Sequence, residues 1–269
     1  MRMSRRTGVS WVVAVAIVIS LLYLAGCQGG KNDSLENIKK AGHIRIAMGL
    51  GYPPFCYYNA RQELAGFDVG VARELAKRMG VDAKLIAVDS RNIIGRLNTG
   101  DYDTILGSMA ITEERAKLVD FSIPYYHARS QIMVSKHSPF KTIKDLKGKT
   151  IGVMEESTFK DDAEKLGAGC IRQYRTNNDA LAALEKREVD AVVTDDVVGM
   201  YGKNRIGFKI ENLGDTLSYN QIAIAVRKGD VSLLRKINAV IGEMRTDGTI
   251  GQLVERISHK HDEPTLPLK

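Results

Sequence analysis

The chain has 269 residues, a formal net charge of +7 at pH 7, 44% apolar residues and three cysteines. This apolar content is enough for a packed core, and the length suits one large domain or two ordinary ones. The basic excess is mild and is not interleaved with aromatic residues as in a nucleic-acid groove, so we expect no nucleic-acid partner. No cysteine and histidine spacing fits zinc, and nothing indicates a metal, another cofactor or an oligomer, so we expect a monomer.

The N-terminus has the features of an export signal. A basic segment with Arg5 and Arg6 precedes an apolar run, residues 11–25, which is shorter than the roughly 20 residues of a membrane span. The run ends in Leu-Ala-Gly before Cys27, which resembles a bacterial lipobox. That resemblance implies a signal peptide at 1–26, lipid attachment at Cys27 and an anchored extracytoplasmic protein. The alternatives are an uncleaved anchor helix with an incidental cysteine and a twin-arginine signal.

Strand-like and helix-like segments alternate after the N-terminal region. β-branched residues between glycines predict a strand at 43–48, and apolar residues at four-residue spacing predict a helix at 67–79. Two prolines in 51–55 predict a rigid turn. We further expect strands at 83–88 and 102–107, a short helix at 92–99, a polar segment at 111–117 and an aromatic turn at 121–126.

A second series of the same kind follows. Thr176 is expected to cap a helix with Asp179 at its third position, and Ser157 to cap a helix that ends at Leu166. Strands alternating with helices favour parallel sheets, and two series indicate two α/β lobes with a cleft between them. The other expected elements are strands at 130–135, 150–154, 189–194 and 222–226, and helices at 142–146, 231–246 and 248–257, with one more beginning at Asp195.

The first polar segment that can bind a ligand runs from Gly107 to Arg115, directly after a predicted strand. Open α/β sheets bind ligands beyond the carboxyl ends of their strands. The guanidinium of Arg115 can hold a carboxylate through two parallel hydrogen bonds, and Ser108 and Thr112 add hydroxyl groups. The alternative is a solvated arginine in a charged loop.

Two more segments follow predicted strands. Ser157 and Thr158 open a helix, where free N–H groups favour an anion, unless Ser157 only caps that helix. Asp195 and Asp196 end a strand and can pair with an ammonium group, unless they too act as a helix cap. One cation, one helix start and one acid together complement the carboxylate and ammonium of an α-amino acid.

Nine motifs in a fixed order carry a family resemblance. They are Tyr52-Pro-Pro-Phe55, Gly66-Phe-Asp68, Leu97-x-x-Gly-x-Tyr-Asp103, Ile111-Thr-x-x-Arg115, Asp120-Phe-Ser122, Pro124-Tyr-Tyr126, Asp145-Leu-x-Gly-Lys149, Asp190-Ala-Val-Val-x-Asp195 and Asp247-Gly-Thr249. Over about residues 35–258 the chain resembles the family 3 bacterial extracellular solute-binding proteins, which bind polar amino acids for ABC importers.

The resemblance implies the α/β type II periplasmic-binding-protein fold, with two lobes joined by two hinge strands. Lobe 1 would be 35–128 plus 220–259, lobe 2 would be 129–219, and residues 27–34 and 260–269 would be a tether and a tail. The lobes would close on a free amino acid, and a membrane permease would recognise the closed form. The protein would be a binding protein and not an enzyme.

The resemblance also implies roles for seven residues. Arg115 and Thr158 would hold the ligand carboxylate, and Asp195 would pair with its ammonium group. Tyr52 would pack on the ligand side chain, although ordinary core packing is an equal alternative. The other three would also bind the ligand: Ser108 and Ala110 on the segment after the predicted strand 102–107, and Ser157 at the start of the helix that ends at Leu166.

Departures from the family pattern leave the side-chain specificity open. Many relatives have an aromatic residue at the position of Ser90, and binders of basic amino acids have acids at the positions of Gly49 and Cys56, so lysine and arginine are disfavoured. The alternative is that Glu155 or Glu156, rather than lying at a solvated helix start, reaches a cationic side chain. Gln221 on the second hinge strand is a further candidate contact. Cys170 would lie in the other lobe from Cys56, so we expect two separate thiols.

Functions of other classes remain as alternatives. A dehydratase-like enzyme on the same scaffold would need a general acid in the cleft, and Glu155, Glu156 and Asp196 are candidates. A sensing module that docks on a receptor is a second alternative.

Overall fold

The computed structural model describes residues 33–258. The predicted signal peptide (1–26), the lipid attachment at Cys27, most of the tether and the tail at 260–269 lie outside the described residues. Within 33–258, no helix is long and apolar enough to cross a membrane.

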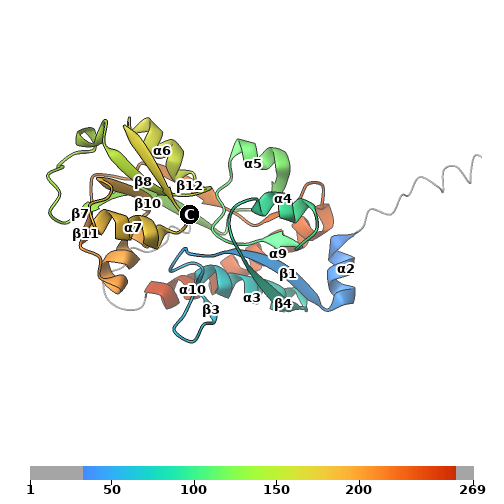
Figure 1. Ribbon diagram of the computed structural model, residues 1–269. Helices are drawn as coiled ribbons and strands as arrows, with labels where there is room; N and C mark the ends of the chain where they lie inside the picture. The colour runs from blue at the N-terminus through green and yellow to red at the C-terminus, as the bar shows by residue number, and fades with distance from the viewer. Residues whose placement is uncertain (1–32, 259–269) are drawn as a thin grey trace, which may run out of the picture. The chain divides into compact units, whose positions relative to one another are not determined.

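The first sheet has five strands and is mainly formed by the first series of elements (Figure 1). Strand β1 pairs in parallel with β4 and β5, and β13 pairs antiparallel with β5 and β6. The strands, in spatial order, are β4 (Asp82–Val88), β1 (His43–Gly49), β5 (Thr104–Ile105), β13 (Ala225–Arg227) and β6 (Val119–Phe121).

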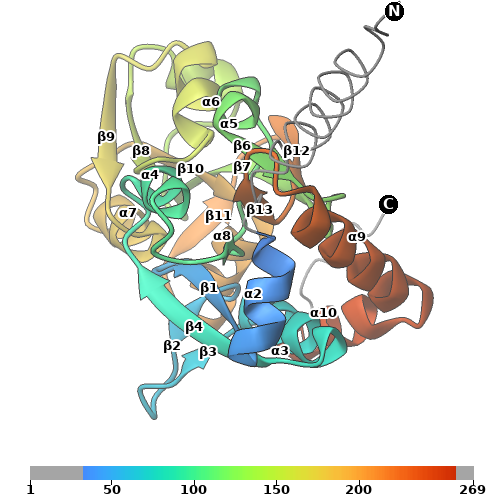
Figure 2. The same ribbon diagram turned by 90° about the vertical axis from the view of Figure 1, so that its right-hand side faces the viewer.

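Helices cover both faces of this sheet because successive strand residues point to opposite sides. Ile46 and Met48 belong to the core beneath four helices, whereas Ala47 packs with Ile93 and Leu97 of a fifth. Figure 2 shows three of the four, α3, α9 and α10, which contact one another. The four are α2 (Ser34–Ala41), α3 (Phe67–Met79), α9 (Val231–Thr246) and α10 (Thr249–Ser258), and the fifth is α4 (Ile93–Asn98).

The second sheet is built around the long strand β7 (Tyr126–Ser135), which is antiparallel to its neighbours β10, β11 and β12. Strand β8 runs parallel to β10 and β9. The path is β11 (Ile210–Asn212), β7, β10 (Ala191–Asp195), β8 (Thr150–Met154) and β9 (Cys170–Tyr174), with β12 (Ser218–Ile222) beside β7.

The second sheet is also covered on both faces. Val193 and Val153 face α6, and Val192 faces α7 (Figure 1). These helices are α6 (Phe159–Lys165) and α7 (Asn177–Glu185). The remaining elements are α5 (Glu113–Leu118), α8 (Asp196–Tyr201), the short helices η1 (Ile143–Leu146) and η2 (Gly202–Ile206), and the small hairpin β2 (Tyr57–Tyr58) with β3 (Leu64–Ala65).

The chain passes between the two sheets at two adjacent places. It leaves β6 for β7 after Phe121 and returns from β12 to β13 after Ile222. The two connections are hydrogen bonded to each other, since the Tyr125 amide donates to the Ile222 carbonyl and the Ser122 amide to the Ile224 carbonyl. The predicted α/β class is therefore confirmed.

Most predicted elements occur with small shifts, and helices 67–79 and 231–246 and strand 150–154 have the predicted bounds. The polar segment expected at 111–117 contains α5, which Thr112 caps by accepting a hydrogen bond from the Arg115 amide. The strand expected at 222–226 is not continuous, because β12 ends at Ile222 and β13 begins at Ala225. Ser157 does not cap α6, because its hydroxyl donates to the Met154 carbonyl instead.

Candidate functional site

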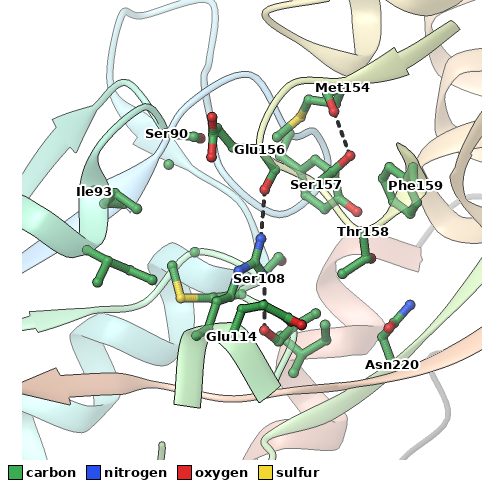
Figure 3. A pocket seen from close by; sticks show the side chains of 18 of the residues that line it. Ser90, Ile93, Ser108, Glu114, Met154, Glu156, Ser157, Thr158, Phe159 and Asn220 are labelled. Carbon is green, nitrogen blue, oxygen red and sulfur yellow. Dashed lines mark hydrogen bonds between the residues drawn. The ribbon is translucent and has the colours of Figure 1, made fainter. Parts of the chain in front are cut away.

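A cavity of about 480 Å³ lies between the carboxyl ends of β1 and β5 and the turn after β8. Its walls come from segments of both sheets. Figure 3 shows Ser90 and Ile93 on one side, with Thr158, Phe159 and Asn220 on the other. Six of the seven predicted ligand-binding residues line it: Tyr52, Ser108, Ala110, Arg115, Ser157 and Thr158. Asp195 does not line it.

Arg115 on α5 spans the cavity. Its Nη1 donates to the Ala110 carbonyl at 2.9 Å, and its Nη2 donates to the Glu156 carbonyl at 2.7 Å, on the opposite wall (Figure 3). Burial lowers the pKa of Arg115, although nearby carboxylates, chiefly that of Glu156, oppose the shift. A guanidinium has five N–H donors, and these two bonds leave the others for a carboxylate.

Ser108 is fixed by a buried hydrogen-bond network behind the cavity. Its hydroxyl donates to Asp68 at 2.8 Å and accepts from the Tyr126 hydroxyl at 2.7 Å, while Tyr125 donates to the other Asp68 oxygen at 2.7 Å. Burial raises the pKa of Asp68 to about 6, although these hydrogen bonds oppose the shift. Ser108 has a φ of 50°, so its backbone is held in a left-handed conformation at the end of β5.

The opposite wall is the turn between β8 and α6. Glu156 adopts a φ of 55°, in the left-handed region, and presents its carbonyl oxygen to Arg115. Thr158 is the N-cap residue of α6, but its side chain makes no capping hydrogen bond. The hydroxyl of Thr158 therefore lines the cavity without a helix-capping role.

Asp195 is fully buried and does not line the cavity. One carboxylate oxygen caps α8 by accepting from the Val197 amide at 3.1 Å, and the other, like the Ser130 hydroxyl opposite it on β7, has no hydrogen-bond partner. Burial and the adjacent Asp196 raise the pKa of Asp195 well above its usual range. Asp196 is itself bound by Arg129 at 2.6 Å.

Tyr52 lines the cavity and lies near Asp195. Burial raises the pKa of Tyr52, and the carboxylates of Asp195, Asp68 and Asp196 raise it further, so the ring lies near these acids. Its ring centroid is 5.3 Å from that of Phe55. This turn packs closely against Gly66, and only glycine fits there, because a Cβ at position 66 would lie 2.2 Å from the Phe55 carbonyl oxygen.

Several lining residues were not predicted. They are mainly apolar side chains of α4 and of the segments after β5 and β8, whose sequence pattern cannot be distinguished from that of core residues. Gln221 is not among the lining residues; its neighbour Asn220 is, because adjacent strand residues point to opposite faces. The unpredicted apolar residues include Ile93, Ile94, Met109, Leu118, Met154 and Phe159.

The cysteines and acids outside the cavity carry no metal site. Cys56 is buried, Cys170 is exposed and both thiols are free, which confirms the expectation of two separate thiols. Among residues 33–258, no three histidine, cysteine or acidic side chains are grouped so that they could hold a metal ion.

The model of the bacterial extracellular solute-binding proteins, family 3, matches residues 44–259. The chain belongs to this family. It is 32% identical over 257 residues to the probable amino-acid-binding protein YxeM of Bacillus subtilis, covering 91% of this chain and 94% of that one.

Two solved structures of amino-acid-binding proteins are also similar to this chain. An ancestral arginine-binding protein bound to glutamine is 37% identical, with a TM-score of 0.76, covering 81% of this chain and 99% of that one. The ancestral amino acid-binding protein AncCDT-1, a precursor of cyclohexadienyl dehydratase, is 32% identical, with a TM-score of 0.77, covering 83% and 98%. The predicted type II periplasmic-binding-protein fold is therefore confirmed.

Proposed function

We propose that this protein captures a free amino acid in the cavity and delivers it to the membrane permease of an ABC importer. The observation that carries the proposal is Arg115, a cation that spans the cavity between two polar walls. Membership of a family of extracellular solute-binding proteins supports the same function. The ligand would be released unchanged, so the protein would act as a binding protein and not as an enzyme.

The ligand's α-groups would be recognised from both walls. Arg115 and Thr158 would bind the carboxylate, with Ser157 beside them, and Ser108 and Ala110 would supply backbone groups. Asp195 would pair with the ammonium group through its free oxygen, because a buried carboxylate oxygen without a partner is costly and an ammonium would satisfy it. Tyr52 would pack on the ligand between them, and it would have to shift for this contact to form.

Capture would occur by closure of two lobes. Lobe 1 would comprise 35–128 and 220–259, and lobe 2 would comprise 129–219, hinged where β7 and β12 pair. A ligand that contacts both lobes binds the closed form better and shifts the population toward it. The closed form would then dock on the permease.

The location of the protein follows from the predicted N-terminus. Cleavage before Cys27 and lipid attachment at Cys27 would hold a monomer at the outer face of the cytoplasmic membrane or in the periplasm. A single lipid chain binds membranes only marginally, so the lipid would mainly keep the protein close to its permease.

Thermal unfolding against a panel of amino acids tests the proposal. The purified protein is first unfolded and refolded to remove bound ligand. The panel is the twenty amino acids plus ornithine, citrulline, cystine and small carboxylates. An amino acid at 100 times its dissociation constant should stabilise the fold by about 2.7 kcal/mol. Stabilisation by a carboxylate that lacks an ammonium group, and by no amino acid, would contradict the role of Asp195 and favour an enzyme.

A further inference from the structure

The cavity extends well beyond the groups that would recognise the α-carboxylate and α-ammonium. Its volume of about 480 Å³ falls in the range of roughly 300–1,000 Å³ of pockets that enclose drug-sized ligands. In Figure 3, Ser157 and Thr158 lie on one side, and the space continues to Ser90 and Ile93 on the other. A ligand that fills it therefore needs a long side chain.

The far part of the cavity is lined by apolar side chains together with three neutral polar residues, Ser90, Asn92 and Asn98. Ile93 and Met109 pack together in one buried cluster, and Ile94 packs against that cluster. Met154 faces them from the end of β8, with its sulfur held 3.2 Å from the Asn177 amide nitrogen. Methionine side chains are polarizable and adapt to apolar ligands of varied shape. This part of the cavity favours a hydrocarbon or thioether side chain.

The charged residues of the cavity provide no buried partner for a charged ligand side chain. Three residues with a charge at neutral pH line it in the described chain, namely Glu114, Arg115 and Glu156. Glu114 and Glu156 are exposed, so water already solvates their carboxylates. The remaining donors of Arg115 would be occupied by the α-carboxylate of the ligand. A buried charge without a partner costs far more than an apolar group in the same place.

We infer that the cavity selects a neutral amino acid with a long apolar side chain, such as methionine or leucine, over arginine, lysine and glutamate. This inference rests on the proposed function and specifies its ligand class. It differs from a solved relative that is an ancestral arginine-binding protein. The difference arises from the side-chain end of the cavity, where Ile93 and Ile94 are apolar and the acid beside Ser90, Glu156, is exposed to water and gives a guanidinium no buried partner (Figure 3).

Titration calorimetry on the refolded full-length protein tests the inference with methionine, alanine, arginine, glutamine and glutamate. Methionine should bind at least tenfold more tightly than any of the other four. The substitution Ile94→Ala should weaken the binding of free methionine about fivefold more than the binding of free alanine, because the methyl side chain of free alanine does not reach this part of the cavity. Ile123→Ala is a matched control, since Ile123 is exposed and does not line the cavity; it should change the two affinities equally.

The possible failures are distinguishable. If arginine or glutamine binds as tightly as methionine, the inference is overturned and the proposed function stands. If Ile94→Ala and Ile123→Ala weaken methionine binding to the same extent, the side chain of the methionine ligand does not contact α4, and the inference is also overturned. If none of the five amino acids binds but another amino acid stabilises the protein in the thermal panel, the inference is overturned and the proposed function stands. If no amino acid of that panel binds, while the refolded protein gives the cooperative unfolding of a native fold, the proposed function itself fails.

Discussion

Arg115 is hydrogen bonded to the backbone of Glu156 across the cavity. Its Nη2 lies 2.7 Å from the Glu156 carbonyl oxygen, while Nη1 lies 2.9 Å from the Ala110 carbonyl oxygen on its own side. One side chain thus connects the segment after β5 with the turn after β8 before any ligand is considered. A carboxylate placed here would meet an arginine that the two backbone carbonyls already orient.

Replacing Arg115→Ala should therefore weaken amino-acid binding severely. Loss of a buried, hydrogen-bonded charge partner costs about 2–5 kcal/mol, or roughly 30-fold to several thousandfold in the dissociation constant. Arg115→Lys should recover only part of this, because an ammonium group lacks the fixed fork of a guanidinium. Calorimetric titration measures both. Lys117→Ala on the same helix is the control, and equal losses in Lys117→Ala and Arg115→Ala would contradict the role of Arg115.

The residues proposed to bind the α-carboxylate of the ligand could be predicted because they lie in polar motifs at strand ends. Arg115 and Thr158 follow this rule, and both line the cavity. The apolar half could not be predicted, because Met109 and Ile93 look like core residues in sequence and are core residues that also face the cavity. The burial of Asp195 outside the cavity depends on packing between distant segments, which no local pattern encodes.

The fold shows the same division. Helix α3 has the predicted bounds because its apolar spacing and the glycine that ends it are local signals. No local pattern predicts strand β12, which was expected only as a hinge strand from the family resemblance, because Ser218–Ile222 is polar and mostly not buried and is held by pairing with β7. Helix α5 had a signal that could have been used, namely Thr112 followed by acidic Glu113 and Glu114 in the first turn.

Asp68 should make the stability of the protein fall as the pH rises. Its folded pKa is about 6, against an ordinary value of 3.8, so the folded state binds the proton more tightly than the unfolded state. This contribution is fully present below pH 3.8 and is lost through pH 6, on the order of 3 kcal/mol. Asp68→Asn removes the titration and keeps an acceptor for Ser108 or Tyr125.

The measurement for Asp68 is the free energy of unfolding by urea in both proteins between pH 4 and pH 7. The wild type should lose stability relative to Asp68→Asn across this range. A constant difference between the two proteins would show that the carboxyl group of Asp68 has an ordinary pKa in the folded protein.

Asp195 should make amino-acid affinity rise with pH. Burial and the neighbouring Asp196 raise its pKa, and a ligand ammonium group beside it would favour the ionised form again. Binding then releases a proton below the raised pKa, so affinity increases by at most tenfold per pH unit. Titrations between pH 4 and pH 8 should show this slope in the wild type and a weaker, flat response in Asp195→Asn. An unchanged slope in Asp195→Asn would assign the proton to another group.

The two described cysteines should differ sharply in reactivity toward a thiol reagent. Burial raises the pKa of Cys56 to about 12, so almost no reactive thiolate forms at pH 8, whereas Cys170 is exposed. In a Cys27→Ser protein, mass spectrometry after iodoacetamide should find Cys170 modified in the native state and Cys56 only after unfolding. Early modification of Cys56 would indicate that the core around it opens.

An ion pair between segments of the two sheets should assist closure of the proposed lobes. Asp89, in the segment after β4, lies 3.3 Å from the Nε of Arg175, which follows β9 on the other sheet. Such exposed pairs contribute about 0–1 kcal/mol, and salt screens them. Arg175→Ala should therefore weaken ligand binding up to about fivefold at low salt, and the difference from wild type should shrink at 1 M NaCl.

Arg91→Ala is the matched control for this pair. Arg91 also binds Asp89, at 2.7 Å, but both residues belong to the same segment, so removing Arg91 leaves the contact with Arg175 in place. Loss of Arg91 also leaves more of the Asp89 charge to act on Arg175, so affinity should hold or rise slightly. A salt-dependent loss in Arg91→Ala as large as in Arg175→Ala would mean that the charge of the segment, and not its link to the other sheet, governs closure.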